Sequence, residues 1–217
     1  DFLRKVRELA KAHGIVLIFD ECTSGFRQSF GGLHTLYGVD PDMAVFGKAL
    51  GNGYAVTAVI GRRAVMEAAQ NSFISSTFWT ERIGSAAALA TLDVMEQTQS
   101  WEVITGIGVD ITQRWRELAA KHGLEISTAG LPALTGFAFK GANAAAYKTL
   151  ISQEMLERGY LAATSVYTCL AHTPDTVDGH FYARDPLFAL IAECEAGRDV
   201  SSLLRGPICH AGFKRLN

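Results

Sequence analysis

Two short apolar runs, each closed by a charged residue, constrain the fold of this chain most strongly. Residues 15–19 are Ile-Val-Leu-Ile-Phe and lead into Asp20, and residues 43–46 are Met-Ala-Val-Phe and lead through Gly47 into Lys48. Apolar runs of this length are typical of strands in a buried parallel sheet. Because ligands bind outside the carboxyl ends of such strands, we expect Asp20 and Lys48 to share one edge of a sheet and to form a candidate site.

The first hundred residues predict further elements around these two strands. A helical apolar stripe over residues 2–12 ends at His13 and Gly14, as helices often do. Residues 56–60 predict a third strand, residues 62–69 a short helix, and a longer helix begins near Thr80, a plausible N-cap. Helix and strand in alternation indicate an α/β class for this part of the chain.

The remainder of the chain predicts a smaller α+β domain. Residues 101–122 predict a helix closed by Gly123, and Gly159 ends a second helix over residues 145–158. Residues 124–128, 134–139 and 166–170 predict strands, and Thr173 followed by Pro174 suits the start of a last helix. We therefore predict two domains, residues 1–100 and residues 101–217.

Composition narrows the classes of partner and compartment. With 217 residues, 48% hydrophobic content and a formal net charge of −2, the chain predicts a soluble globular protein. It lacks the basic run that would suggest nucleic acid. The longest strongly apolar run has five residues, far short of the roughly 20 that cross a bilayer, so we expect no membrane partner and a cytoplasmic location. The four cysteines form no C-x-x-C pair, which predicts reduced thiols and no metal site.

A lysine and a carboxylate at one sheet edge suit one kind of chemistry in particular. A lysine amine condenses with an aldehyde, and a carboxylate can keep a pyridine nitrogen protonated, which are the two groups that pyridoxal-phosphate enzymes need. On spacing alone, Lys48 is equally well explained as a solvated residue of a glycine-rich turn. Two other readings lack their signals: Ala49 stands where a phosphate-binding loop needs serine or threonine, and no G-x-S-x-G elbow is present.

Four sequence blocks in order then carry a resemblance to a known family. They are D-E-C-T-S-G-F-R from Asp20, Y-G-V-D-P-D from Tyr37, G-K-A-L-G-N-G from Gly47 and A-V-I-G from Ala58. Together these blocks resemble the class III pyridoxal-phosphate aminotransferases, and the similarity runs through nearly the whole chain. Residues 165–167 and 170–173 look closest to the glutamate-1-semialdehyde aminomutase-like branch.

The resemblance implies a fold, a cofactor and roles for individual residues. The fold is the pyridoxal-phosphate transferase fold type I, here the later part of the large-domain sheet plus the C-terminal domain. Lys48 matches the lysine that forms a Schiff base with pyridoxal 5'-phosphate, and Asp20 matches the partner of its pyridinium nitrogen. Cys22 stands where relatives have a valine packing on the ring. Thr77 matches a threonine that binds the cofactor phosphate across the interface of a homodimer, although a plain turn residue is the simpler interpretation.

The sequence also departs from the family pattern. Residues 79–84, Trp-Thr-Glu-Arg-Ile-Gly, stand where most relatives read Gly-Asn-Pro. Arg82 in this segment is a hypothetical ligand of a substrate carboxylate, and a surface salt bridge with Glu81 or another acid is the competing interpretation. The family's phosphate cup, its ring-stacking aromatic residue and several strands would lie before the first residue. We therefore expect the chain to be a piece of a longer protein, with weak or no cofactor binding when isolated and activity in the parent.

The predicted function is amino-group transfer through Lys48 between a small amino donor and a carbonyl acceptor. Two alternatives stay open at this point: an aminomutase that moves nitrogen within one molecule, and a non-catalytic, truncated dimerisation module. His34, His122, His180 and His210 stand in unrelated sequence contexts, and we expect them to be surface or packing residues. The segment 206–215 predicts a structured tail of undefined role.

Overall fold

The computed structural model describes residues 1–78 and 80–210, and the chain forms two compact units. Unit 1 is Asp1–Val103 and unit 2 is Ile104–Asn217. Each unit has its own three-stranded sheet. Within the described residues, no helix combines the length and the apolar character that crossing a membrane requires.

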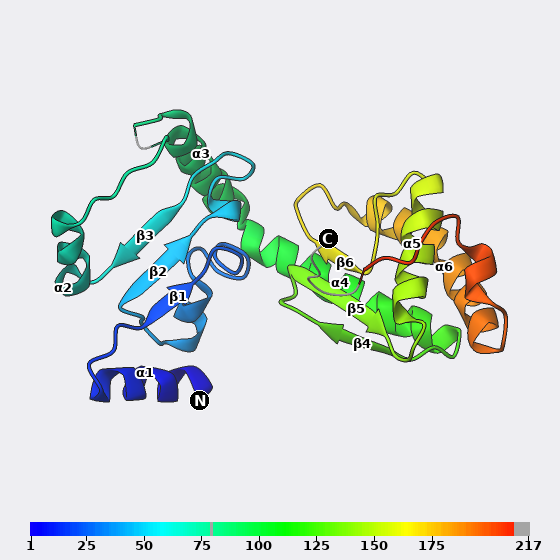
Figure 1. The fold of residues 1–217 in the computed structure, drawn as a ribbon. Helices are drawn as coiled ribbons and strands as arrows, with labels where there is room; N and C mark the ends of the chain where they lie inside the picture. Colours follow the sequence, from blue (N-terminus) through cyan, green and yellow to red (C-terminus); the bar gives the residue numbers. More distant parts are fainter. Residues whose placement is uncertain (79, 211–217) are drawn as a thin grey trace. The chain divides into compact units, whose positions relative to one another are not determined.

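The sheet of unit 1 contains β1 (Ile18–Asp20), β2 (Met43–Phe46) and β3 (Ala58–Gly61), in that order (Figure 1). Strands β1 and β2 are parallel, with Asp20 opposite Val45, whereas β2 and β3 are antiparallel. The central strand β2 carries the buried residues Ala44 and Phe46. On the outer strands, Ile18, Val59 and Ile60 remain 45 to 57% exposed, so this sheet leaves apolar surface open.

The helices of unit 1 surround this sheet. They are α1 (Phe2–Ala12), α2 (Arg63–Met66) and α3 (Ile83–Thr98), with 3-10 turns η1 (Leu33–Tyr37), η2 (Lys48–Leu50) and η3 (Glu67–Asn71). Helix α3 packs Ala88 and Leu92 against a small cluster formed by Ala44, Phe46 and Leu50. The hydrophobic core of unit 1 is therefore built around β2 and η2, next to Lys48.

Asp42 ties three elements of unit 1 together. Its Oδ2 accepts hydrogen bonds from Arg7 Nη1 and from the backbone N–H of Leu17, each at 2.8 Å. Its Oδ1 lies 3.6 Å from Arg62 Nη1. The Leu17 hydrogen bond and the two arginine charges hold the pKa of Asp42 below its ordinary value, so the carboxylate anchors α1, the start of β1 and the end of β3.

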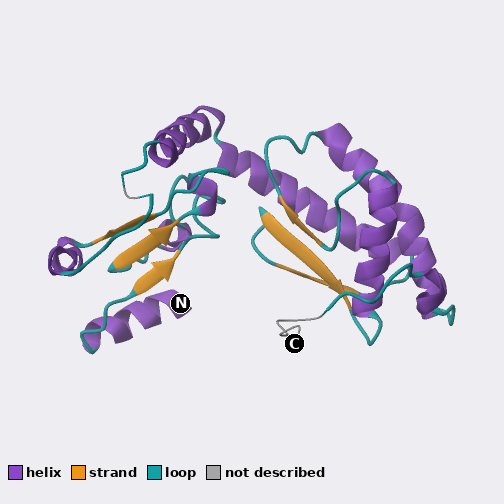
Figure 2. Ribbon diagram, turned by 45° about the horizontal axis from the view of Figure 1, so that its top comes forward, coloured by secondary structure: helices purple, strands orange, loops and turns teal. Residues whose placement is uncertain are grey.

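Unit 2 is an antiparallel sheet with helices gathered on one side (Figure 2). Its strands are β4 (Ile126–Ala129), β5 (Leu134–Phe139) and β6 (Ser165–Tyr167), with β5 in the centre. Its helices are α4 (Ser100–Lys121), which begins in the last residues of unit 1, α5 (Ala144–Glu157), α6 (Pro174–Glu195) and the turn η4 (Val200–Leu203). Gly108 of α4 sits so close to Pro132 that an added Cβ would lie 1.8 Å from the Pro132 carbonyl oxygen.

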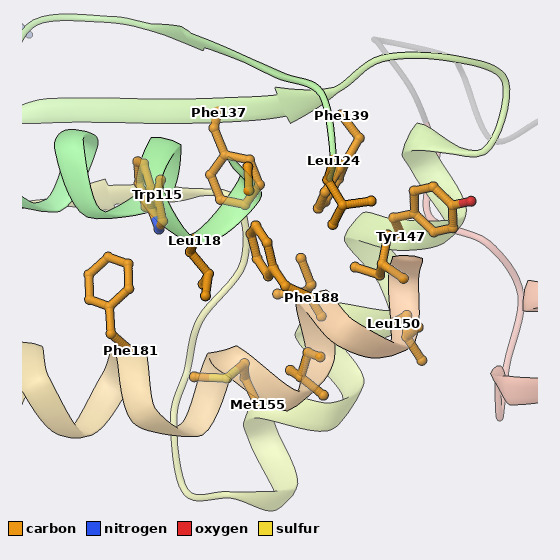
Figure 3. Close-up of a cluster of buried hydrophobic side chains, with 14 of the residues drawn as sticks. Trp115, Leu118, Leu124, Phe137, Phe139, Tyr147, Leu150, Met155, Phe181 and Phe188 are labelled. Atoms are coloured by element: carbon orange, nitrogen blue, oxygen red, sulfur yellow. The ribbon is translucent and has the colours of Figure 1, made fainter. Parts of the chain in front are cut away.

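The core of unit 2 is large and aromatic (Figure 3). Phe137 and Phe139 alternate with outward residues along β5, as the two-residue period of a strand requires. Their rings contact Trp115 of α4, Tyr147 of α5 and Phe188 of α6 at centroid distances between 4.8 and 5.9 Å. Side chains of three helices and the central strand thus form one continuous core, which gives this unit many more buried apolar contacts than the sheet of unit 1.

The structure corrects several element boundaries. Strand β1 begins at Ile18 rather than at residue 15, and β4 and β6 are shifted or shortened relative to residues 124–128 and 166–170. Helix α3 starts at Ile83, so Thr80 is not its N-cap; the carboxylate of Glu81 instead accepts hydrogen bonds from the N–H groups of Ile83 and Gly84. The N-cap at Thr173 is confirmed, because its side chain accepts from Thr176 N. Residues 211–215 of the predicted tail lie outside the described residues.

Candidate functional site

Asp20 and Lys48 lie at the same edge of the unit 1 sheet. Asp20 is the last residue of β1, and Lys48 comes two residues after the end of β2, as the first residue of η2. Strands β1 and β2 lie side by side (Figure 1) and run parallel, so the end of β1 at Asp20 and the turn after β2 that carries Lys48 share one edge of the sheet. This is the position at which open parallel sheets bind ligands.

Lys48 has an unusual backbone conformation and a defined side-chain partner. Its φ is +45°, in the left-handed region that non-glycine residues adopt at a cost. Its Nζ donates a 2.7 Å hydrogen bond to Thr23 Oγ1, in the loop that follows Asp20. The side chain is therefore directed toward the residues at the end of β1, and its charge contributes to lowering the pKa of Asp20.

Asp20 is held as a carboxylate by its immediate surroundings. Its Oδ1 accepts a 3.0 Å hydrogen bond from the backbone N–H of Cys22. That hydrogen bond first, then the Cys22 side chain and the positive charge of Lys48, keep the pKa of Asp20 below its ordinary value. The group is exposed and ionised, and it is available as an acceptor for a protonated ring nitrogen.

Cys22 joins the same cluster. Partial burial, followed by its hydrogen bond to Asp20 and the negative charge of that residue, raises the pKa of the Cys22 thiol, which favours the neutral form. Its Sγ lies 3.5 Å from where a Cβ on Gly47 would stand, and Thr57 Cγ2 lies 3.3 Å from the same point. Glycine at position 47 therefore leaves room for the loop that carries Lys48 to approach the thiol.

A buried acid supports the loop behind these residues. Glu21 is 4% exposed and accepts hydrogen bonds from Ser24 Oγ, from His34 N at 3.0 Å and from His34 Nδ1 at 2.9 Å. Burial alone would raise the pKa of Glu21, but the hydrogen bonds from Ser24 and His34 outweigh it and hold the pKa below its ordinary value. Asp20 therefore precedes a residue whose position is fixed by three hydrogen bonds.

The remaining predicted residues lie elsewhere. Thr77 lies in the exposed loop between η3 and α3, and no contact among the described residues joins it to Lys48 or Asp20. Arg82 is exposed at the N-cap of α3, and no ion pair among the described residues links it to Glu81, whose carboxylate instead caps the helix. The salt-bridge interpretation of Arg82 is therefore wrong for Glu81, and the substrate role stays a prediction.

Sequence reasoning missed two contributors to this region. Thr23 is the hydrogen-bond partner of Lys48, and His34 is a hydrogen-bond partner of the buried Glu21 rather than an isolated packing or surface residue. Both contacts join residues far apart in the chain, 25 and 13 positions respectively. A local sequence pattern does not predict such a pair. The pairing of β1 with β2 brings the Thr23 loop to Lys48.

The geometry thus joins an amine, an ionised carboxylate and a neutral thiol at one sheet edge. An amine in this position can bond to a carbonyl carbon, and a neighbouring carboxylate can stabilise a cationic ring nitrogen. The chemistry of these donors fits pyridoxal phosphate on the side of the ring that faces Asp20 and Lys48.

Comparison with known proteins agrees with this geometry. The family described as "Aminotransferase class-III" matches residues 1–173. A 3-aminobutyryl-CoA aminotransferase of Cloacimonas acidaminovorans (strain Evry) is 37% identical over 69% of this chain and 36% of its own length. A glutamate-1-semialdehyde 2,1-aminomutase of Neisseria meningitidis is 30% identical over 82% of this chain and 45% of its own length.

A solved structure gives the same fold. The FumI protein of Sphingopyxis sp. MTA144, in its PLP internal aldimine form, is 25% identical and superposes with a TM-score of 0.83 over 94% of this chain and 50% of that one. The chain therefore spans half, or less than half, of the length of these relatives. With the family pattern covering most of the sequence and the strand order placing Lys48 beside Asp20, the chain belongs to the class-III aminotransferase family.

Proposed function

We propose that the whole protein is a pyridoxal-phosphate-dependent aminotransferase in which Lys48 and Asp20 are the catalytic residues. The observation that carries this proposal is that the Lys48 amine and the Asp20 carboxylate follow neighbouring parallel strands, close enough for the charge of one to lower the pKa of the other. The similarity to a 3-aminobutyryl-CoA aminotransferase supports it. The substrates are a small amino donor and a carbonyl acceptor.

Each residue has a separate task in this proposal. When bound, pyridoxal phosphate supplies an aldehyde carbon and a ring that accepts the electron pair released from a substrate C–H bond. Lys48 would hold the cofactor through Nζ, and its amine would carry the substrate proton as acid and base. Asp20 keeps the ring nitrogen protonated, and Cys22 packs against the ring. Thr77 binds the phosphate group of the partner subunit's site.

The decisive experiment uses the protein produced from its complete gene. Borohydride reduction with pyridoxal phosphate, followed by peptide mapping, is expected to place the adduct on Lys48. Lys48→Ala is expected to lower turnover by at least about 100-fold, the lower range for an acid–base group. Lys140→Ala, which removes an exposed lysine paired with Glu125 in unit 2, is the matched control and should leave turnover unchanged. An adduct on another lysine would refute the assignment.

The aminomutase remains a second candidate because several relatives that match more than four-fifths of this chain carry that activity in their names. The two reactions differ in their need for substrates. A transferase converts an amino donor only when a carbonyl acceptor is supplied, whereas a mutase isomerises a single amino carbonyl compound. Product analysis with one substrate at a time separates them, and a protein inactive in both assays would favour the dimerisation module.

We also propose a homodimer, a cytoplasmic location and the division into domains 1–100 and 101–217. The dimer is supported by the loop that carries Thr77, in which Phe73 is 96% exposed and Phe78 60% exposed, values that suit a segment covered by a partner. Four free cysteines, Cys22, Cys169, Cys194 and Cys209, suit a reducing compartment. Two separate sheets and cores support the domain division.

A further inference from the structure

Unit 2 contains a cavity that the aminotransferase chemistry does not use. It has a volume of about 270 Å³, and the residues that line it come from α4, from residues 160–162, from β6 and from the first half of α6 with the loop before it. Ile111 and Val177 contribute apolar walls, and His172, His180, Ser165 and Thr176 contribute polar groups. Among the described residues that line it there is no aspartate or glutamate, so neither His172 nor His180 faces a carboxylate across the cavity.

His172 presents a fixed hydrogen-bond donor. Its Nδ1 accepts a 3.0 Å hydrogen bond from the backbone N–H of Cys169, so this nitrogen carries a lone pair and not a proton. The neutral ring must then hold its proton on Nε2. Among the described residues no hydrogen bond occupies that Nε2–H group, which leaves a donor of defined orientation on a residue that lines the cavity.

His180, which also lines the cavity, has a ring nitrogen without a hydrogen-bond partner among the described residues. That nitrogen, Nε2, is shut off from water. Burial first, and then the positive charges of Arg184 and Arg114, lower the pKa of His180 to about 3. A neutral imidazole surrounded by cationic groups would be stabilised in its protonated form by an anion nearby.

A buried cation lies one helical turn further along α6. Arg184 is fully buried, and of its guanidinium nitrogens only Nη2 has a described hydrogen bond, 2.7 Å to the Ala163 carbonyl oxygen. Nε and Nη1 have no hydrogen-bond partner in the part of the chain that the structure describes, and the group packs near the rings of Trp115 and Phe137. Burial lowers the pKa of Arg184 to about 10. Within the described part of the chain, no carboxylate pairs with it, and an uncompensated buried charge is costly.

The two carboxylates of this region, Asp110 and Asp178, already pair with Arg114. Arg114 lies 2.6 Å from Asp178 and 3.8 Å from Asp110, and it stacks on the Phe181 ring. Those carboxylates therefore offset the charge of Arg114 at the exposed end of the cluster. The charge of Arg184 is left for some other anion to compensate.

We propose that this cavity binds a small aliphatic carboxylate. The carboxylate group accepts a hydrogen bond from His172 Nε2–H, lies beside the His180 ring and partly compensates the charge of Arg184. The short apolar tail packs on Ile111 and Val177. The volume of about 270 Å³ is just below the roughly 300 Å³ at which pockets for drug-sized ligands begin, which favours a small ligand.

The test follows binding to the full chain by NMR of the histidine rings, without pyridoxal phosphate and without turnover, so its result is independent of the proposed catalysis. Sodium butyrate is the probe, and n-butanol and n-butylamine supply the same tail with a neutral and a cationic head. Butyrate is expected to saturate, to shift the His172 and His180 resonances and to raise the apparent pKa of His180. The two other probes are expected to bind at least tenfold more weakly.

Three variants sharpen this result. His172→Phe is expected to weaken butyrate binding by about tenfold or more, as expected for loss of a hydrogen bond to a charged group. His172→Gln, which restores an N–H donor, should recover most of the affinity. Cys169→Ala removes the thiol that lies 3.2 Å from His172 Nδ1 but keeps the backbone N–H that orients the ring, and it should bind like the parent. Equal binding of butyrate and butanol, or saturation unaffected by His172→Phe in a folded variant, would overturn the proposal, as would a cavity that takes up water only.

Discussion

The backbone of Lys48 occupies a conformation that suits glycine better than lysine. A φ of +45° lies in the left-handed region, where the Cβ of an L-residue crowds the neighbouring backbone at a cost of about 1 to 2 kcal/mol. Asn52, four residues later in the same turn, has a φ of +44°. The turn that presents the amine is thus strained at the residue proposed for catalysis, a pattern seen where function overrides local stability.

This strain predicts an inverted order of stability between two variants. Lys48→Gly should unfold with a free energy about 1 kcal/mol higher than Lys48→Ala, since glycine adopts a positive φ without the Cβ clash. At Lys11, within α1, the same pair of substitutions should show the opposite order, with alanine more stable by about 1 kcal/mol. Urea unfolding of the four variants measures both differences. Alanine more stable than glycine at position 48 would show that the turn is not strained.

At this scale the sequence predicted the charged residues and missed their neutral partners. Asp20 and Lys48 could be placed because each directly follows an apolar run, which fixes its position at a strand end. Thr23 and His34 could not, because their contacts depend on how the loop between β1 and β2 folds back. Hydroxyl and imidazole groups are common in loops, and their partners are set by tertiary structure rather than by spacing.

Helix α4 contains two glycines with opposite surroundings. A Cβ at Gly106 would meet no heavy atom within 4 Å, whereas a Cβ at Gly108 would lie 1.8 Å from the carbonyl oxygen and 2.4 Å from the carbonyl carbon of Pro132. Both atoms at position 132 belong to the backbone and cannot rotate away. The two glycines are therefore a matched pair within one helix.

Substitution of this pair should change stability in opposite directions. Gly106→Ala should raise the free energy of unfolding by roughly 0.5 to 1 kcal/mol, because alanine favours the helix. Gly108→Ala should lower it by about 1 to 3 kcal/mol, the usual cost of overpacking. Chemical denaturation followed by tryptophan fluorescence suits the test because Trp115 lies in the same helix. Similar effects at the two positions would argue against the close approach to Pro132.

At the scale of elements, the predicted bounds of a strand or helix matched the observed ones where the backbone hydrogen bonds agreed with the local sequence pattern. Strand β5 has the predicted bounds, residues 134–139, because its alternation matches its central place in a sheet. Residues 15–17 read as a strand, but Ile15 N–H donates to Ala10 at the end of α1 and Leu17 N–H donates to Asp42. Thr80 is a residue type that often caps helices, but the N–H groups of Ile83 and Gly84 donate to the carboxylate of Glu81 instead.

For the whole molecule, the two units differ in how much apolar surface they bury. In unit 2 the core joins three helices and a sheet through Trp115, Phe137 and Phe188, all 5% exposed or less. In unit 1 the fully buried cluster consists of Ala44, Phe46 and Leu50, and several apolar residues of its sheet face solvent. Since burial of apolar surface dominates folding free energy, unit 2 should be the more stable.

This difference predicts independent folding of one unit. A polypeptide of residues 100–217, which keeps α4 complete, should unfold cooperatively in urea and show dispersed NMR spectra. A polypeptide of residues 1–99 should show a shallow unfolding transition. In the full chain, hydrogen exchange should be slowest in β5 and in the helices α4, α5 and α6. A cooperative transition for residues 1–99, or slower exchange in β1 and β2 than in β5, would contradict this assignment.

The contact between Gly108 and Pro132 has a further consequence for evolutionary change. Only glycine fits at position 108 as long as the loop at Pro132 keeps its path. Substitution of Gly108 therefore requires a change in that loop. Position 106, where an added Cβ would meet no heavy atom within 4 Å, is free to diverge. In descendants of this sequence, replacement at 108 should therefore accompany insertion, deletion or rerouting of the segment before β5.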